Sequence, residues 1–127
     1  MIADTTFLIH WSRETKTQRM GRARTFLASH RRDVVRTTII TVAELAVGFP
    51  TSAAAWQEIL SRWSVYRLHD GVAQAAADVD RERTAAGQRI GENDTWIAGF
   101  CLYYREPVIS LDAAAFDRVP GLRRLAY

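Results

Sequence analysis

The chain has 127 residues, the size of one ordinary domain, and its share of 48% hydrophobic and 24% charged residues is typical of a globular protein. One cysteine excludes an internal disulfide and indicates a reducing compartment, while a net charge of +3 permits nucleic-acid binding without requiring it. Asp4 interrupts the first apolar residues, so neither a signal peptide nor a membrane span is expected. We expect a single cytoplasmic domain over residues 1–127.

The first half of the chain alternates between short strand-like runs and helical patterns. Residues 1–4 predict a strand, and a helical turn follows through residues 7–11. An amphipathic helix is expected over about residues 18–30, where apolar side chains recur at helical spacing: Met20, Ala23, Leu27 and His30. Residues 34–39 are rich in β-branched side chains and predict a second strand. The helix after it is expected to end near Gly48 and Pro50.

The second half of the chain continues the alternation. Helices are expected over about residues 52–63, from Val72 to Gly87, and over about 94–105. Strands are expected at residues 64–68 and 107–111, with a last short strand in the segment 122–127. This order predicts an α/β fold, a three-layer α/β/α sandwich with a central parallel sheet. The first strand and the strand before Asp112 are expected to be neighbours near the centre of the sheet.

Four acidic residues lie where apolar segments end or helices begin: Asp4, Glu44, Asp94 and Asp112. Ligands of a parallel α/β sheet bind beyond the carboxyl ends of the strands, so these acids are expected to converge there. Glu44 is in line with Ile40 and Val47 on its helix, and Asp94 follows a similar apolar line, so both are expected to face the sheet. Clustered carboxylates at low exposure favour a hard divalent cation, which offsets their repulsion.

Each acid also has a structural explanation of its own. Asp4 and Asp94 lie at predicted helix starts, and Asp112 precedes a turn through residues 113–116; at each place a carboxylate could accept hydrogen bonds from free N–H groups. Glu44 matches a capping box with Thr41, three residues earlier. One shared cation explains all four acids together, and we therefore prefer it to four separate caps.

The expected chemistry is metal-assisted cleavage of phosphate esters, with Mg²⁺ or Mn²⁺ as the ion. Asp4 and Asp94 are the expected direct ligands, while Glu44 and Asp112 would hold water molecules or complete a second site. The hydroxyl of Thr6 could orient a carboxylate, touch substrate or merely cap a turn. Asp117 is a weaker alternative to Asp112, because it lies past the strand end.

Other residue types give weaker signals. The three histidines lack zinc-ligand spacing, and the four tryptophans are expected to serve packing. An early basic cluster is open to two interpretations, a solvated helix face or a surface for phosphate groups. Its members are Arg13, Lys16, Arg19, Arg22, Arg24, Arg31 and Arg32. A receiver domain would need a lysine late in the chain, and the one lysine is Lys16.

Three segments resemble one known family. The run from Asp4 to Ile9 resembles the opening of PIN domains, and Ile90 to Ala98 is similar to their third acidic motif. Asp112 followed by the segment 116–122 resembles the ending of VapC toxins. Two positions depart from the usual pattern: Thr6 stands where Ser or Asn is commoner, and Asp112 where Asn is frequent.

The resemblance implies a Mg²⁺-dependent endoribonuclease, the toxin of a type II toxin–antitoxin pair, with a PIN-like fold. It also implies that Asp4, Glu44, Asp94 and Asp112 surround the metal site, that the toxin forms a homodimer, and that a VapB-like antitoxin inhibits it. The RNA substrate, whether tRNA, rRNA or mRNA, does not follow from the sequence. The alternative is a catalytically weak PIN-like module that binds RNA or protein.

Overall fold

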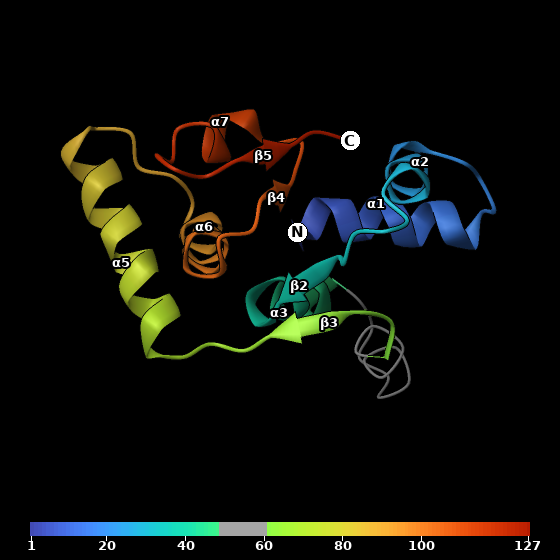
Figure 1. Cartoon of the computed structure of the whole chain (residues 1–127), viewed down its shortest axis with the longest axis horizontal. Coiled ribbons are helices and arrows are strands. Elements are labelled where there is room, and N and C mark those ends of the chain that lie inside the picture. The colour runs from blue at the N-terminus through green and yellow to red at the C-terminus, as the bar shows by residue number, and fades with distance from the viewer. Residues whose placement is uncertain (49–60) are drawn as a thin grey trace.

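The computed structural model describes residues 1–48 and 61–127, so most of the predicted helix over residues 52–63, including Trp56, lies outside the described residues. Five parallel strands form one sheet in the order β3-β2-β1-β4-β5 (Figure 1). The strands are β1 (Ile2–Ala3), β2 (Arg36–Thr38), β3 (Ser64–Tyr66), β4 (Val108–Ile109) and β5 (Arg124–Leu125). The first strand lies between β2 and β4, which confirms the predicted central pair.

Helices cover both faces of this sheet (Figure 1). They are α1 (Thr5–Lys16), α2 (Arg22–Ser29), α3 (Ile39–Gly48), α5 (Asp70–Ala85), α6 (Glu92–Tyr104) and α7 (Ala113–Phe116). Helices α1 and α2 lie on one side of the central strands, and α5 and α6 on the other. The predicted α/β/α sandwich is therefore confirmed.

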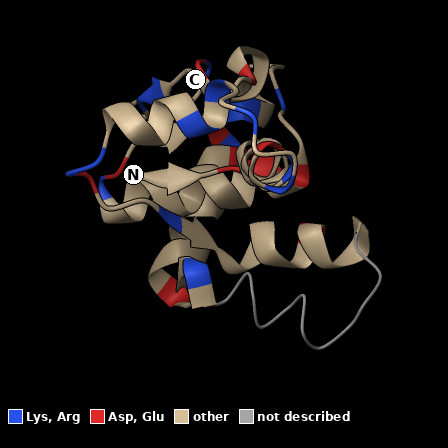
Figure 2. Ribbon diagram, turned by 90° about the vertical axis from the view of Figure 1, so that its right-hand side faces the viewer, with Lys and Arg blue, Asp and Glu red and all other residues tan. Residues whose placement is uncertain are grey.

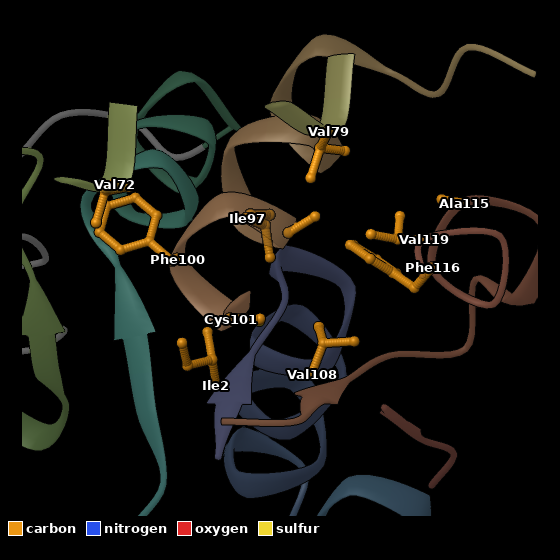
Figure 3. Close-up of a cluster of buried hydrophobic side chains, with 11 residues drawn as sticks. Ile2, Val72, Val79, Ile97, Phe100, Cys101, Val108, Ala115, Phe116 and Val119 are labelled. Carbon is orange, nitrogen blue, oxygen red and sulfur yellow. The ribbon is translucent and has the colours of Figure 1, made fainter. Parts of the chain in front are cut away.

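The central strands divide their side chains between two cores, because successive residues of a strand point to opposite faces. Ile2 and Val108 enter the core beneath α6, with Phe100 and Cys101 (Figure 3). Ala3 and Ile109 enter the core beneath α1 and α2, together with Phe7, Leu8 and Phe26. Cys101 is buried, and burial raises the pKa of its thiol, as expected for a core cysteine.

Helices α5 and α6 approach each other closely at Gly99. A Cβ atom at this position would lie 2.7 Å from the Cβ of Ala76 and 2.8 Å from its backbone nitrogen. Both residues are small and buried, so the two helix backbones come nearer than larger side chains would allow. This contact fixes α6 against α5.

Some sequence expectations were wrong in detail. The helical turn expected at residues 7–11 is the twelve-residue helix α1, whereas the helix expected from residue 18 begins at Arg22. Met20 therefore belongs to the connection before α2, and its side chain is 62% exposed. Within residues 1–48 and 61–127, no helix has the length and apolar character needed to cross a bilayer.

Candidate metal and nuclease site

Asp4 lies at the end of the central strand and just before α1. Its backbone N–H extends the ladder with β4 by donating to the Ile109 carbonyl at 3.2 Å. One carboxylate oxygen, Oδ1, accepts from the Phe7 N–H at 2.7 Å and so caps α1. Burial raises the pKa of Asp4, and the Asp112 carboxylate adds to this, against hydrogen bonds from Ser110 and Phe7 and the nearby His10. Asp4 is therefore a cap and also a member of an acidic cluster.

Asp94 is the third residue of α6, and it is half-buried. Loss of solvent is the main cause that raises its pKa from 3.8 to about 6, and repulsion from the carboxylates of Asp112, Glu44 and Asp4 raises it further. Each of those three acids comes from a different part of the chain. The four predicted acids therefore lie near enough to one another to interact electrostatically around Asp94.

Asp112 follows β4 and caps the short helix α7, since its Oδ1 accepts from the Ala115 N–H at 2.9 Å. Ser110, fully buried at the end of β4, connects this acid to Asp4. Its hydroxyl accepts from the Asp112 N–H at 3.0 Å and hydrogen-bonds the Asp4 carboxylate. The sequence did not single out Ser110, although a polar residue directly after two buried strand residues is a usable signal.

Glu44 projects from α3 towards the starts of two other helices. Its Oε2 accepts from the Thr5 hydroxyl, and its Oε1 accepts from the Asn93 side-chain amide at 2.8 Å. The alternative explanation of Glu44, a capping box with Thr41, is wrong, because α3 begins at Ile39 and the Thr38 hydroxyl accepts from the Thr41 N–H. The expected apolar line is also wrong in part, because Val47 is 90% exposed. Glu44 lies at the border of the buried face.

Thr6 and Asp117 lie differently from the four acids. The Thr6 side chain is exposed in the first turn of α1, and the hydroxyl that contacts an acid is that of Thr5. A contact between Thr6 and substrate stays a prediction. Asp117 is bound by the guanidinium of Arg124 at 2.7 and 2.8 Å, and this ion pair lowers the pKa of Asp117. Asp117 is therefore held by Arg124, and its rank below Asp112 stays a prediction.

The donor chemistry of this cluster fits Mg²⁺ or Mn²⁺, which prefer carboxylate oxygens and water. Caps occupy one oxygen of Asp4 and one of Asp112, and each carboxylate keeps a second oxygen. Within the described ranges, no three acidic, histidine or cysteine side chains are already arranged as a metal cage. The cluster therefore has the charge and the oxygen donors for a cation, and binding one would require the side chains to draw closer.

The remaining candidates have structural roles. His69 caps α5 by accepting from the Gly71 N–H, and His30 stacks on Phe26 with ring centroids 4.0 Å apart. Trp11 and Trp63 pack edge to face. In the early basic cluster all side chains are exposed except the half-buried Arg24. Figure 2 marks the Lys and Arg positions in blue along the ribbon. Their exposure is compatible with both interpretations of this cluster.

The raised pKa of Asp94 predicts how the stability of the metal-free protein depends on pH. The folded protein binds more protons at Asp94 than the unfolded chain does, so the free energy of unfolding should fall as pH rises from about 4 to about 6. We expect a loss of about 1 kcal/mol, reduced by solvent screening of this half-exposed group. Urea unfolding in the presence of a chelator at pH 4.5 and at pH 7.5 measures this fall in the free energy of unfolding. In Asp94→Asn the contribution of Asp94 to the fall should be absent. An equal pH response in both proteins would contradict the prediction.

The fold and the acids define a class of protein, a parallel α/β domain with a carboxylate cluster at the carboxyl edge of its sheet. The sequence matches the PIN domain family over residues 1–122. The chain therefore belongs to the PIN domain family. A comparison with curated proteins gave no match.

Solved structures agree with this assignment. A chain of VapBC2 from Rickettsia felis, bound to a promoter DNA fragment, superposes with a TM-score of 0.81 at 17% identity, covering 99% of this chain and 97% of that one. DNA-bound VapBC from Salmonella typhimurium gives 0.81 at 22% identity, with coverage of 98% and 96%. VapBC-5 from Mycobacterium tuberculosis, of the VapBC family of toxin-antitoxin systems, gives 0.61 at 27% identity, with coverage of 73% and 82%.

Proposed function

We propose that this PIN domain is a Mg²⁺- or Mn²⁺-dependent endoribonuclease that hydrolyses RNA phosphodiester bonds and acts as the toxin of a type II toxin–antitoxin pair. One observation carries the proposal: in a chain of the PIN domain family, four acids from separate segments lie close enough together for Asp112, Glu44 and Asp4 to repel the Asp94 carboxylate. A protein stabilises such a cluster most simply with a divalent cation.

The four acids have different roles in this proposal. Asp4, at the end of the central strand, and Asp94, in the first turn of α6, bind the ion directly in this proposal. Glu44 and Asp112 orient water molecules around it. A bound ion supplies a Lewis acid for a phosphoryl oxygen and lowers the pKa of water. The chain's own part is to orient the attacking water and to hold the phosphodiester in line with it.

The structural neighbours support the proposed toxin role and the proposed partners. VapBC and FitAB complexes of several bacteria share the fold of this chain. We propose a VapB-like antitoxin that covers the acidic site, and a homodimer as the form of the toxin. The exposed basic cluster supplies positive charge for the RNA backbone in this scheme.

The test is RNA cleavage by protein freed of any inhibitor. We expect tRNA, rRNA or mRNA to be cut with Mg²⁺ or Mn²⁺ and to stay intact in EDTA. Asp4→Asn, purified in the same way, controls for contaminating nucleases, because asparagine keeps the helix cap while weakening the site. If all three RNA classes stay uncut with both ions, the enzyme assignment fails. RNA binding without cleavage would favour the binding-module alternative.

A further inference from the structure

Glu44 joins three helices through its carboxylate. It belongs to α3, while its two hydrogen-bond donors are Thr5, the first residue of α1, and Asn93, the second residue of α6. Thr5 donates to Oε2, and Asn93 donates to Oε1 at 2.8 Å. One donor on each oxygen fixes both the position and the plane of the carboxylate, which a single hydrogen bond would leave free to rotate.

Each donor adjoins one of the proposed metal ligands in the sequence. Thr5 follows Asp4 directly, and Asn93 directly precedes Asp94. The two hydrogen bonds therefore tie the Glu44 carboxylate to the starts of α1 and α6, where those two ligands lie. Each oxygen of Glu44 also keeps a second lone pair, so both remain able to accept from a water molecule.

We propose that Thr5 and Asn93 are positioning residues, which hold the Glu44 carboxylate in the orientation that the RNA-cleaving site requires. This inference rests on the proposed function and names the residues that support it. Neither donor is assigned as a ligand. Their action is indirect, through Glu44, in the manner of the outer partners that orient metal-site carboxylates elsewhere.

The variants follow from the donor chemistry. Thr5→Val keeps the shape of the side chain and removes its donor, whereas Thr5→Ser keeps the hydroxyl. Asn93→Ala removes the second donor. Glu92→Ala, at the exposed neighbour of Asn93 on α6, is the matched control.

We expect Thr5→Val and Asn93→Ala each to lower kcat by about tenfold, the low end of the range for lost outer partners of metal ligands, because Glu44 acts through water in this proposal. The KM for RNA should change little, since neither side chain is assigned to bind substrate. Thr5→Ser and Glu92→Ala should stay near the wild-type rate. In a Glu44→Gln background, both donor substitutions should have almost no further effect, because they act through Glu44.

A second measurement does not depend on activity. Calorimetric titration of the metal-free proteins with Mn²⁺ should give an affinity about tenfold weaker for Asn93→Ala than for the wild type. Thermal unfolding shows that each variant is folded. Losses of stability with unchanged kcat and unchanged Mn²⁺ affinity would reduce Thr5 and Asn93 to tethers between helices and overturn the inference.

The outcomes separate the inference from the proposed function. Wild-type protein that cuts RNA, with Thr5→Val and Asn93→Ala equally fast, refutes the positioning role alone. Wild-type protein that neither cuts RNA nor binds Mn²⁺ refutes both. Additive effects of the donor substitutions in the Glu44→Gln background would also refute action through Glu44.

Discussion

Asp94→Asn is expected to lower metal-dependent RNA cleavage by about a thousand-fold, which corresponds to a loss of several kcal/mol of transition-state stabilisation. The amide retains the size of the side chain but gives up the negative charge that a hard cation requires. Wild-type protein should melt at a higher temperature in Mn²⁺ than in chelator, and the variant should lose this shift. Initial cleavage rates and paired thermal melts measure the two effects.

The Asp94→Asn variant separates a loss of activity from a loss of stability. Removing the Asp94 charge relieves repulsion from Asp4, Glu44 and Asp112, so the metal-free variant should be at least as stable as the wild type at neutral pH. Lost activity would then not come from unfolding. Unchanged melting shifts with Mn²⁺ would remove Asp94 from the metal ligands, and an unchanged cleavage rate would exclude it from catalysis.

Gly99→Val is expected to destabilise the fold by about 2–3 kcal/mol, which lowers the melting temperature by roughly 10 °C. The added side chain would meet the backbone of Ala76, with the new Cβ only 2.8 Å from its nitrogen and 2.9 Å from its Cα. Backbone atoms cannot turn aside as a flexible side chain would, so α5 and α6 must separate. Chemical denaturation of the two proteins measures the difference.

Thr84→Val is the control for this experiment, because it places the same side chain on the exposed face of α5. Its stability should stay within about 0.5 kcal/mol of the wild type. A Gly99→Val protein of wild-type stability would show that the two helices tolerate a wider separation than the contact with Ala76 implies.

The sheet was predictable because its central strands are runs of consecutive apolar residues in the sequence. Buried pairs such as Ile2-Ala3 and Val108-Ile109 are apolar on both faces, as a strand covered by helices requires. The pairing of the first strand with the strand before Asp112 was also expected, whereas the places of the other three strands come from the structure. Helix boundaries were predicted less accurately. Met20 was assigned to an apolar helix face because its spacing fits a helix, but it lies in the connection before α2 and is exposed.

The candidate site was predictable at its acids and much less at their partners. Strand ends and helix starts locate Asp4, Asp94 and Asp112 from local pattern alone. The contacts of Glu44 with Thr5 and Asn93 join residues 39 and 49 positions apart, so only the packing of three helices brings them together. A threonine or asparagine beside an acid carries no sign of which carboxylate it will bind.

The pairing of β1 with β4 determines at which stage of synthesis on the ribosome the acidic site can form. Ile2 and Ala3 find their partners at Val108 and Ile109, and Ser110 and Asp112 follow immediately. Loop closure over so long a stretch is slow, and it cannot start before those late residues have been synthesised. A growing polypeptide therefore carries Asp4, Glu44 and Asp94 without the strand that gathers them. Any hydrolytic activity of this domain would therefore arise only after β4 has been synthesised and has paired with β1.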